Sequence, residues 1–312
     1  MTTPAEHDIA ATAIEHPAAA GAGTNAFEDA PQREIALPQG TIRYRELGTG
    51  APIVFVHGLL VNGLLWRKVV PPLAQSFRCI VPDLPLGGHR LPMSADADLT
   101  PPGLARLIAA FIAELGLEDV TLVGNDTGGA LCQLVITDHP ERIGRLVLTN
   151  CDAYENFLPP LFRPFQWIAH VPGALFAATQ PMRIGALHRL PIAFGWVAKH
   201  EIDRRVRDDY LHGVLHDRAI RRDTGKFLRG ISSRYTLDAA QRFGEFRRPV
   251  LLPWAVEDRA FTWAYAERIA AAFPDVRLER IEDSLTFVSE DQPERLVELI
   301  AEFAIVPSRT VA

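Results

Sequence analysis

The stretch of residues 119–129 reads Asp-Val-Thr-Leu-Val-Gly-Asn-Asp-Thr-Gly-Gly. Its apolar, β-branched run Val120–Val123 is typical of a strand buried in a parallel sheet. The run ends in Gly-Asn-Asp-Thr-Gly at 124–128, after which helical spacing begins. A strand that turns so sharply into a helix leaves no room for neighbouring side chains, which explains the two glycines. The pattern predicts that Asp126 stands at a helix N-terminus, where free amides and the helix dipole stabilise a negative charge.

The rest of the chain alternates predicted strands with predicted helices, a pattern that favours a mostly parallel, doubly wound α/β sheet covered on both faces. A hairpin is expected around Leu-Pro-Gln-Gly at 37–40, and a helix over 65–77. The other expected strands are 52–56, 79–82, 120–123, 146–149, 250–254 and 276–281, and the other expected helices are 101–115, 129–138, 263–273 and 293–303.

The alternation stops between about residues 152 and 243, which are rich in Pro, Phe, Arg and His at helical spacing. We predict a helical insert after the sixth core strand, forming a cap over the edge of the sheet where open α/β sheets bind ligands. The core would then comprise residues 31–151 and 244–305. Residues 1–30, dominated by small residues and proline, are predicted to be a disordered tail.

Size, composition and charge narrow the classes of function. The chain has 312 residues, of which 48% are hydrophobic and 22% charged, so it can bury a large core. Its net charge of −6 provides no basic field for phosphates, and nucleic acid is not expected as a partner. No apolar run is long enough to span a bilayer, so no membrane partner is expected either. Because the first 32 residues contain no Lys or Arg, a secretory signal is not expected.

The three cysteines, Cys79, Cys132 and Cys151, lie in apolar strand or helix patterns without metal-ligand spacing. We interpret them as reduced core residues of a cytoplasmic protein that uses neither a metal nor a cofactor. The sequence leaves the oligomeric state open, with a homo-oligomer among the alternatives.

Several segments together resemble the α/β-hydrolase superfamily over about residues 33–303. They are His57-Gly58-Leu59 after a strand, the Gly-x-Asp-x-Gly turn at 124–128, the helical insert, and Glu257-Asp258 after a strand. In this superfamily the turn is the nucleophile elbow, and the nucleophile is followed along the chain by an acid and then a histidine. Aspartate in place of serine at the elbow resembles the branch of haloalkane dehalogenases and epoxide hydrolases.

The resemblance implies roles for individual residues. Asp126 would be the nucleophile, and Asp258 the acid whose work is to orient a histidine. The backbone amides of Leu59 and Thr127 would form the oxyanion hole. The histidine position, within Asp-Ser-Leu-Thr-Phe at 283–287, holds Thr286 instead.

Alternatives remain open for these residues. The elbow pattern also fits an ordinary turn whose aspartate caps a helix, although the strand, helix and His-Gly context favours the nucleophile. Asp258 is either the relay acid or a carboxylate hydrogen-bonded to Thr286 or to backbone, and Asp152 is a weaker alternative for the acid. We interpret His57 as a structural residue of the loop rather than a base.

Two departures from the branch bear on the substrate. In dehalogenases a Trp follows the nucleophile and an Asn or similar donor follows His-Gly, so that two N–H groups hold the halide, whereas this chain has Thr127 and Leu59. In epoxide hydrolases tyrosines of the cap protonate the epoxide oxygen. Here Tyr154, Tyr210 and Tyr235 are the candidates.

In the two-step reaction that the resemblance implies, Asp126 attacks carbon to form an ester, and a base then activates the water that hydrolyses the ester. Without the histidine this base is missing, and such a loss costs several orders of magnitude in rate. Three interpretations follow. A histidine elsewhere supplies the base, with His89, His212 and His216 as candidates. Alternatively Asp126, its pKa raised by burial and by Asp258, acts as a general acid or base in non-hydrolytic chemistry. Or the protein binds a small apolar ligand without turnover.

The sequence therefore predicts a hydrolase-like, cofactor-free enzyme that acts on a small, largely apolar organic substrate through Asp126. The alternative is a catalytically degenerate homologue that retains the ligand pocket. Some aromatic residues of the insert are expected to face this pocket, although packing is the commoner role for such residues. The candidates are Phe157, Phe162, Phe165, Trp167, Phe176 and Trp196.

Overall fold

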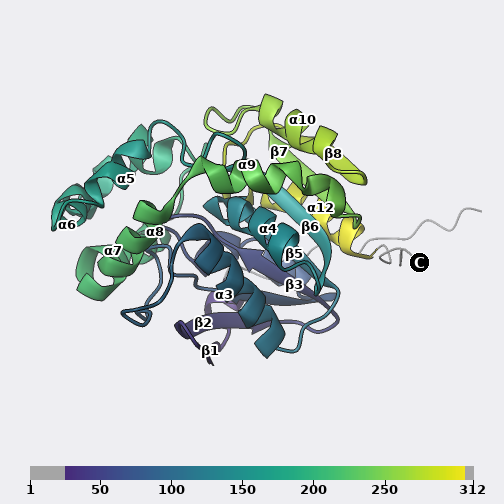
Figure 1. Cartoon of the computed structure of the whole chain (residues 1–312), viewed down its shortest axis with the longest axis horizontal. Coiled ribbons are helices and arrows are strands. Elements are labelled where there is room, and N and C mark those ends of the chain that lie inside the picture. The colour runs from purple at the N-terminus through teal and green to yellow at the C-terminus, as the bar shows by residue number, and fades with distance from the viewer. Residues whose placement is uncertain (1–24, 306–312) are drawn as a thin grey trace, which may run out of the picture.

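The computed structural model describes residues 25–305, and a single sheet forms its centre. The strands are β1 (Gln32–Leu37), β2 (Gly40–Leu47), β3 (Ala51–Val56), β4 (Phe77–Pro82), β5 (Val120–Asp126), β6 (Ile143–Cys151), β7 (Val250–Ala255) and β8 (Val276–Ile281). They form an eight-stranded sheet in the order β1-β2-β4-β3-β5-β6-β7-β8 (Figure 1). The pairs β1–β2 and β2–β4 are antiparallel, and all other pairs are parallel. The mostly parallel sheet and the hairpin at 37–40 are confirmed.

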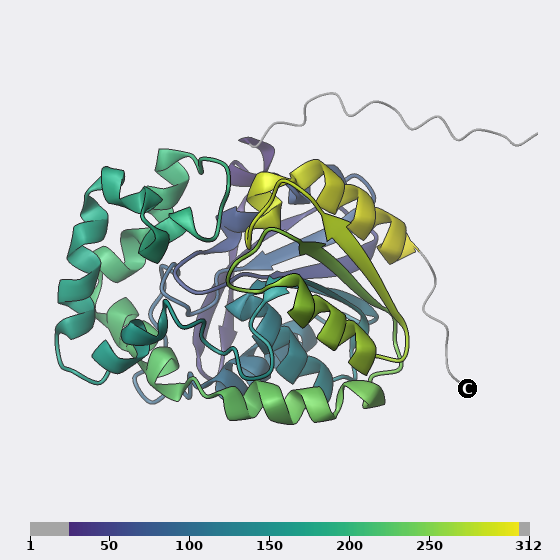
Figure 2. The same ribbon diagram turned by 90° about the horizontal axis from the view of Figure 1, so that it is seen from above.

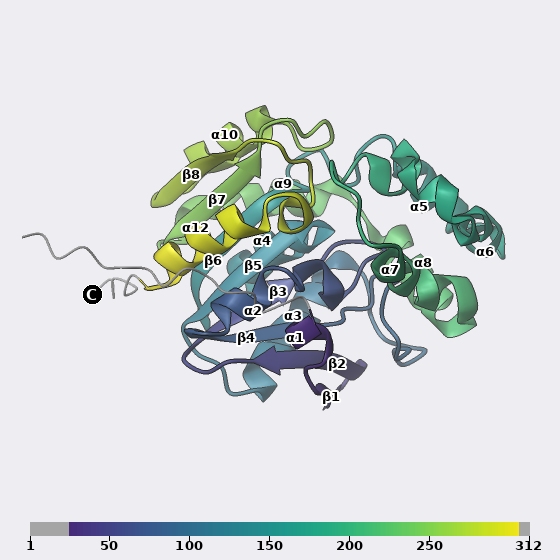
Figure 3. The same cartoon turned by 180° about the vertical axis from the view of Figure 1, so that it is seen from behind.

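Helices cover both faces of this sheet. The helices are α1 (Asn25–Glu28), η1 (Gly63–Trp66), α2 (Val70–Leu73), α3 (Pro101–Glu114), α4 (Thr127–Asp138), α5 (Arg163–Ile168), α6 (Ala174–Thr179), η2 (Gln180–Arg183), η3 (Gly185–Arg189), η4 (Pro191–Gly195), α7 (Arg204–His216), α8 (Arg218–Gly230), α9 (Ser233–Gln241), η5 (Phe243–Glu245), α10 (Trp263–Ala272), α11 (Val288–Asp291) and α12 (Pro293–Ile305). One apolar cluster packs α3, α4, α9 and α10 on one face, and a second packs η1, α2 and α12 on the other (Figures 1 and 3). Because both faces are covered, β5, β6 and β7 consist almost entirely of buried residues.

The helix expected over 65–77 is wrong. The segment forms the 3₁₀ turn η1 and then the short helix α2, in which Pro71 and Pro72 occupy the first turn. A proline inside a continuous helix would remove a hydrogen bond and clash with the preceding turn, so a new helix begins here instead.

The expected disordered tail falls mainly on residues 1–24, which lie outside the described part of the chain. Its end departs from the prediction, since Asn25–Glu28 forms α1 and Phe27 is fully buried. The guanidinium of Arg45 lies 5.3 Å from the centre of the Phe27 ring. One aromatic side chain that reaches the core offsets the cost of ordering a short segment, and the small residues around it hid this signal.

The predicted insert between β6 and β7 contains helices α5 to α9. Helices α5, α6, α7 and α8 lie beyond one end of the sheet (Figures 1 and 2), whereas α9 runs beside α4 and shares its apolar cluster. The part that projects over the sheet therefore finishes near residue 230. Within residues 25–305, no helix is both long and apolar enough to cross a membrane.

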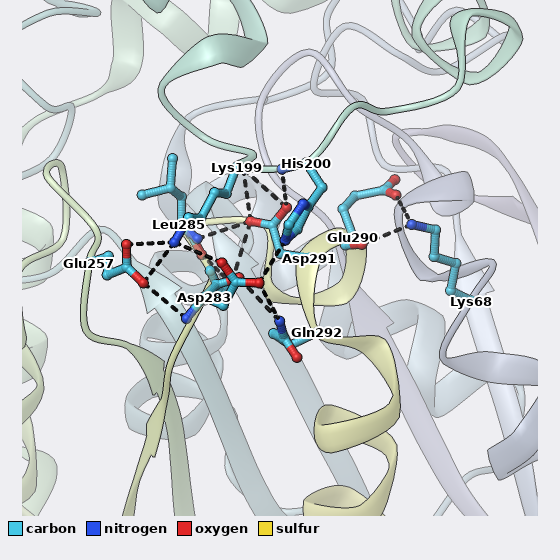
Figure 4. A network of polar contacts seen from close by, with 10 residues as sticks. Lys68, Lys199, His200, Glu257, Asp283, Leu285, Glu290, Asp291 and Gln292 are labelled. Atoms are coloured by element: carbon cyan, nitrogen blue, oxygen red, sulfur yellow. Dashed lines mark hydrogen bonds and ion pairs between the residues drawn. The ribbon is translucent and has the colours of Figure 1, made fainter.

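A buried ion pair ties η1 to α11 behind the sheet. One amino group of Arg67 donates to a carboxylate oxygen of Glu290 at 2.8 Å, and both side chains are almost fully buried. The hydroxyl of Tyr210 donates to the other oxygen at 3.2 Å. Lys68 approaches the same carboxylate at 3.1 Å (Figure 4). This cluster links three segments that are distant in the sequence.

We expect Glu290→Gln to lower the free energy of unfolding by about 3 kcal/mol, because removing one partner leaves the Arg67 charge buried and uncompensated. Urea denaturation followed by circular dichroism measures the change. The matched control is Glu298→Gln, whose exposed carboxylate pairs with Arg295 at 3.1 Å and should cost about 1 kcal/mol or less. Equal losses in the two variants would contradict the importance of burial.

Candidate active site

The elbow places Asp126 at the junction of β5 and α4. Its backbone has φ 53° and ψ −133°, a conformation that costs a non-glycine residue free energy. A Cβ on Gly128 would lie 2.4 Å from the carbonyl oxygen of Val56, and one on Gly124 would lie 2.7 Å from the sulfur of Cys132. Neither glycine can therefore be replaced without moving the backbone. The Asp126 side chain makes no helix-capping hydrogen bond, which disfavours the ordinary-turn interpretation.

Backbone amides hold the carboxylate of Asp126. The amide of Leu59 donates to Oδ2 at 3.1 Å, and the amide of Thr127 also bonds the carboxylate. Close approach requires a glycine beside Leu59, since a Cβ on Gly58 would lie 2.1 Å from Oδ2. The two residues expected to form an oxyanion hole thus converge on one side chain. We expect the same amides to stabilise negative charge that develops there during a reaction.

The His57 ring makes hydrogen bonds that hold the loop containing Gly58 and Leu59. Its Nε2 accepts from the amide of Leu84 at 2.9 Å, so its Nδ1 carries the proton and donates to the carbonyl of Gly58, also at 2.9 Å. Burial lowers the pKa of His57 to about 4, which keeps the ring neutral. These contacts agree with a structural role.

Asp258 and Thr286 meet through a direct hydrogen bond. The Thr286 hydroxyl donates to Oδ2 of Asp258 at 2.8 Å, and both residues are buried. The other carboxylate oxygen accepts from the amides of Ala260 at 2.7 Å and Phe261 at 3.0 Å. Burial, the largest influence, raises the pKa of Asp258 to about 6. The threonine thus takes the hydrogen-bonding place that an imidazole would need.

The loop that carries Thr286 is bound to the insert by a polar network (Figure 4). The carboxylate of Asp291 accepts from the amides of Leu285 at 2.9 Å and His200 at 2.9 Å, and both of its oxygens accept from the amide of Lys199. The ammonium of Lys199 reaches the carboxylate of Asp283 at 2.8 Å. Backbone of the insert is therefore fixed to backbone of the loop by one buried carboxylate.

A third carboxyl group, Asp152, lies beside the elbow. The hydroxyl of Thr127 donates to its Oδ2 at 3.1 Å, while Oδ1 is buried without a hydrogen-bond partner among the described residues. Burial and the neighbouring Asp126 charge raise the pKa of Asp152 well above its usual range. Burial and, to a smaller extent, Asp258 raise the pKa of Asp126 to about 7. Asp126, Asp152 and Asp258 thus place three raised pKa values near the elbow, and no basic side chain of residues 25–305 lines the adjoining cavity.

The Asp126 carboxylate opens into an apolar cavity under the insert. Within the described part of the chain, the only charged lining residue is Asp126, and the lining is otherwise apolar apart from Thr179, whose hydroxyl donates to backbone of its own helix. The lining residues are Leu59, Leu60, Asp126, Leu158, Phe162, Phe165, Ala178, Thr179, Met182, Ala193, Phe194, Val197, Leu211 and Phe287. Phe162 and Phe165 were expected here. The aliphatic members carried no sequence signal that separates them from ordinary core residues.

The remaining aromatic candidates do not line this cavity. Phe157 is buried elsewhere in the core, and Trp196 is absent from the lining. Trp167 and Phe176 are instead 67% and 46% exposed. Phe194, which sequence reasoning missed, lines the cavity from η4.

None of the three histidines considered as a base lines the cavity. The ring of His89 is buried, with Nδ1 accepting from the amide of Gly87 at 3.3 Å and Nε2 lying 3.5 Å from the carboxylate of Asp223. His212 and His216 are exposed on α7, with ring centres 4.6 Å apart. No histidine of residues 25–305 therefore lines the cavity beside Asp126.

The tyrosines are also engaged elsewhere. The hydroxyl of Tyr154 donates to the carbonyl of Arg268 at 3.0 Å, and that of Tyr235 accepts from Arg234 at 2.6 Å. Tyr210 bonds the buried Glu290. No tyrosine appears in the cavity lining, so none is placed to protonate a leaving oxygen there.

Comparison with known proteins agrees with this architecture. The family model described as the alpha/beta hydrolase fold matches residues 51–293. The chain belongs to this family. Two solved structures of low identity share its fold. Epoxide hydrolase CorEH has a TM-score of 0.72 and 18% identity, and the match covers 88% of this chain and 99% of that chain. An α/β-hydrolase fold protein from Burkholderia ambifaria has a TM-score of 0.71 and 23% identity, and the match covers 86% of this chain and 97% of that chain.

Two curated relatives of this α/β-hydrolase have named activities. Haloalkane dehalogenase 2 of Mycobacterium tuberculosis is 26% identical over 279 residues, which cover 85% of this chain and 91% of the relative. The cis-3-alkyl-4-alkyloxetan-2-one decarboxylase of Shewanella oneidensis is 26% identical over 275 residues, which cover 84% of each chain. The same fold therefore carries more than one reaction among these relatives.

We expect the stability of this α/β-hydrolase to fall as the pH rises from about 4 to about 7. With pKa values near 7 for Asp126 and 6 for Asp258, the native state retains protons that the unfolded state releases in this window. The unfolded state binds fewer protons, so the free energy of unfolding decreases with rising pH. Asp126→Asn should flatten this dependence and be more stable than the wild type at pH 8. Parallel stability curves from urea titrations would contradict the raised pKa.

Proposed function

We propose that this α/β-hydrolase acts on a small apolar organic molecule through Asp126. The observation that carries the proposal is the position of the Asp126 carboxylate, held by the Leu59 and Thr127 amides and facing an apolar cavity. The carboxylate oxygen attacks an electrophilic carbon, a carbon–oxygen bond forms, and the leaving group departs with the electron pair of the broken bond. The product of this step is an ester on Asp126.

The two carboxylate oxygens of Asp126 have different roles in our proposal, because Oδ2 accepts a hydrogen bond from the Leu59 amide. The oxygen bound by Leu59 is held in place, which leaves Oδ1 as the attacking atom in our proposal. In a later attack by water on the ester carbonyl, the same amides would stabilise the developing oxyanion. The named dehalogenase and decarboxylase relatives lend weight to small organic substrates.

The lining of the cavity narrows the substrate. A hydrogen-bond donor assists the departure of a halide or alkoxide, and among the described residues the lining offers no free side-chain N–H or O–H for this purpose. We therefore favour carbon electrophiles that need little assistance, such as a strained ring or a carbon with a good leaving group. The helices α5 to α8 serve as the cap in this proposal, since Phe162, Phe165 and Leu211 supply one wall.

The second step has no visible base. Asp258 already accepts the hydrogen bond from Thr286, and no described histidine lines the cavity. We infer a long-lived ester and slow hydrolysis. The same hydrogen bond favours a second candidate, a ligand-binding homologue without turnover. The Asp258 carboxylate bonds Thr286 in place of the histidine that it would orient in a catalytic triad.

Exposure to short bromoalkanes, terminal epoxides and a β-lactone should increase the intact mass by one substrate-derived group in at least one case. Labelling should accelerate as the pH rises through about 7, where Asp126 ionises. Asp126→Asn should show no adduct, whereas Asp152→Asn keeps the nucleophile and should still be labelled. Ligand binding without any adduct in the wild type would favour the second candidate, and labelling of Asp126→Asn would exclude Asp126 as the nucleophile.

Restoring an imidazole should restore hydrolysis. In Thr286→His the ring can bond Asp258 and activate water, a contribution of about 10²-fold or more for a positioned base. We expect turnover of the labelling reagent to rise by that factor, measured as product release per enzyme. The double variant Thr286→His with Asp258→Asn serves as the control and should lose most of the gain. A folded Thr286→His protein with unchanged turnover would show that the missing histidine is not the block.

A further inference from the structure

Exposed large apolar side chains gather on one part of the insert. Six such residues occur among residues 25–305, and five of them lie between positions 167 and 190. These five are Trp167, Val171, Phe176, Ile184 and Leu190. The sixth, Ile305, ends α12. A cluster of this kind on the surface marks a site of interaction, whereas single exposed residues do not.

Helices α5 and α6 each carry apolar residues on both their inner and outer sides. Phe165 and Leu175 are buried on the inner side, while Trp167 and Phe176 point outward. Helix α6, Ala174–Thr179, contains no charged residue. In Figures 1 and 2 these two helices form the end of the molecule farthest from β7 and β8. A helix that is apolar all round needs a second apolar phase against its outer side.

The part of the insert that contains these helices has a net positive charge. Residues 161–230 contain 12 Lys and Arg against 6 Asp and Glu, a net charge of +6, whereas the whole chain carries −6. The remainder of the chain is therefore at −12. Residues 161–200 alone contain four Lys and Arg and no acidic residue. The molecule is strongly polarised, with its positive end at the exposed apolar cluster.

Cationic side chains border the apolar cluster directly. A groove between the α5–α6 connection and α8 is lined by apolar residues that include Val171, Leu175 and Phe176, together with four arginines and one acidic residue, Asp217. These arginines are Arg218, Arg221, Arg222 and Arg229. The guanidinium of Arg221 lies 4.9 Å from the centre of the Phe176 ring. Exposed apolar and cationic groups thus adjoin in this groove. We use the name cap face for the groove residues Val171, Phe176, Arg218 and Arg229 together with the other exposed apolar residues of the same segment, Trp167, Ile184 and Leu190.

We propose that the cap face docks on the surface of an anionic lipid bilayer. Aromatic and aliphatic side chains enter the boundary between headgroups and acyl chains, while arginines beside them attract anionic headgroups. A second copy of the chain fits this face poorly, because two-fold pairing would bring one positive segment against another. The sequence contains no apolar run long enough to span a bilayer and so predicted no membrane partner, but docking on a membrane surface requires no spanning segment. The proposal does not depend on the chemistry at Asp126.

Co-sedimentation of the full chain with vesicles tests this proposal. We expect binding to vesicles of phosphatidylcholine with phosphatidylglycerol, little binding to phosphatidylcholine alone, and loss of binding as added salt screens the charges. The double change Trp167→Ser with Phe176→Ser should reduce the bound fraction severalfold, and Ile305→Ser, equally apolar and exposed, should not. Arg218→Glu should weaken binding more than Arg247→Glu, an exposed arginine near β7. Asp126→Asn should bind like the wild type.

Three results would overturn the proposal. The first is no sedimentation with anionic vesicles, and the second is binding that neither the lipid charge nor the cap-face variants change. The third is a dimer in sedimentation velocity that Trp167→Ser with Phe176→Ser dissociates, because the face would then join two copies. Circular dichroism of each variant establishes that a loss of binding is not a loss of folding.

Discussion

The left-handed backbone of Asp126 is the constraint on which the site depends. With φ at 53°, the chain turns from β5 into α4 within one residue and directs the carboxylate toward the loop after β3. The turn closes only because Gly124 and Gly128 lack side chains. The adjoining loop in turn needs Gly58, which lets the Leu59 amide reach Oδ2. The strained backbone of Asp126 is maintained because β5 is paired on both sides, with β3 and β6, at the centre of the sheet.

The electrostatics of the site follow from that placement. Asp126, Asp152 and Asp258 are buried near one another beside amides and hydroxyls, and in the described part of the chain no cationic side chain lines the cavity. Amide and hydroxyl donors lower their pKa values only partly, so desolvation prevails and all three are raised. A carboxylate with a pKa near 7 is ionised only in part at neutral pH. The Thr286 hydroxyl donates a hydrogen bond to Asp258 but is not a base. In our proposal Asp126 can therefore attack carbon, whereas no base assists the later attack by water.

Local patterns predicted the parts of the molecule that local rules determine. The Gly-x-Asp-x-Gly turn and the alternating strands predicted the sheet. Of the two interpretations that the sequence left open for Asp258, the contacts with Thr286 and with backbone agree with a hydrogen-bonded carboxylate. Long-range contacts decided the rest. Phe27 orders a segment of small residues by reaching the core, and Asp291 binds backbone amides of a loop and of the insert, which no spacing reveals. The inner and outer apolar residues of α5 and α6 likewise look alike in the sequence.

The lifetime of the Asp126 ester shows whether the protein combines a nucleophile with an efficient base. We propose that it has the nucleophile and lacks the base. Protein labelled with a reactive electrophile would be freed of excess reagent by gel filtration and its intact mass followed over time at pH 8. We expect the added mass to lie on the peptide that contains Asp126 and to persist for hours. Decay of the adduct within seconds, with one product released per protein, would show that an efficient base is present and would contradict the account.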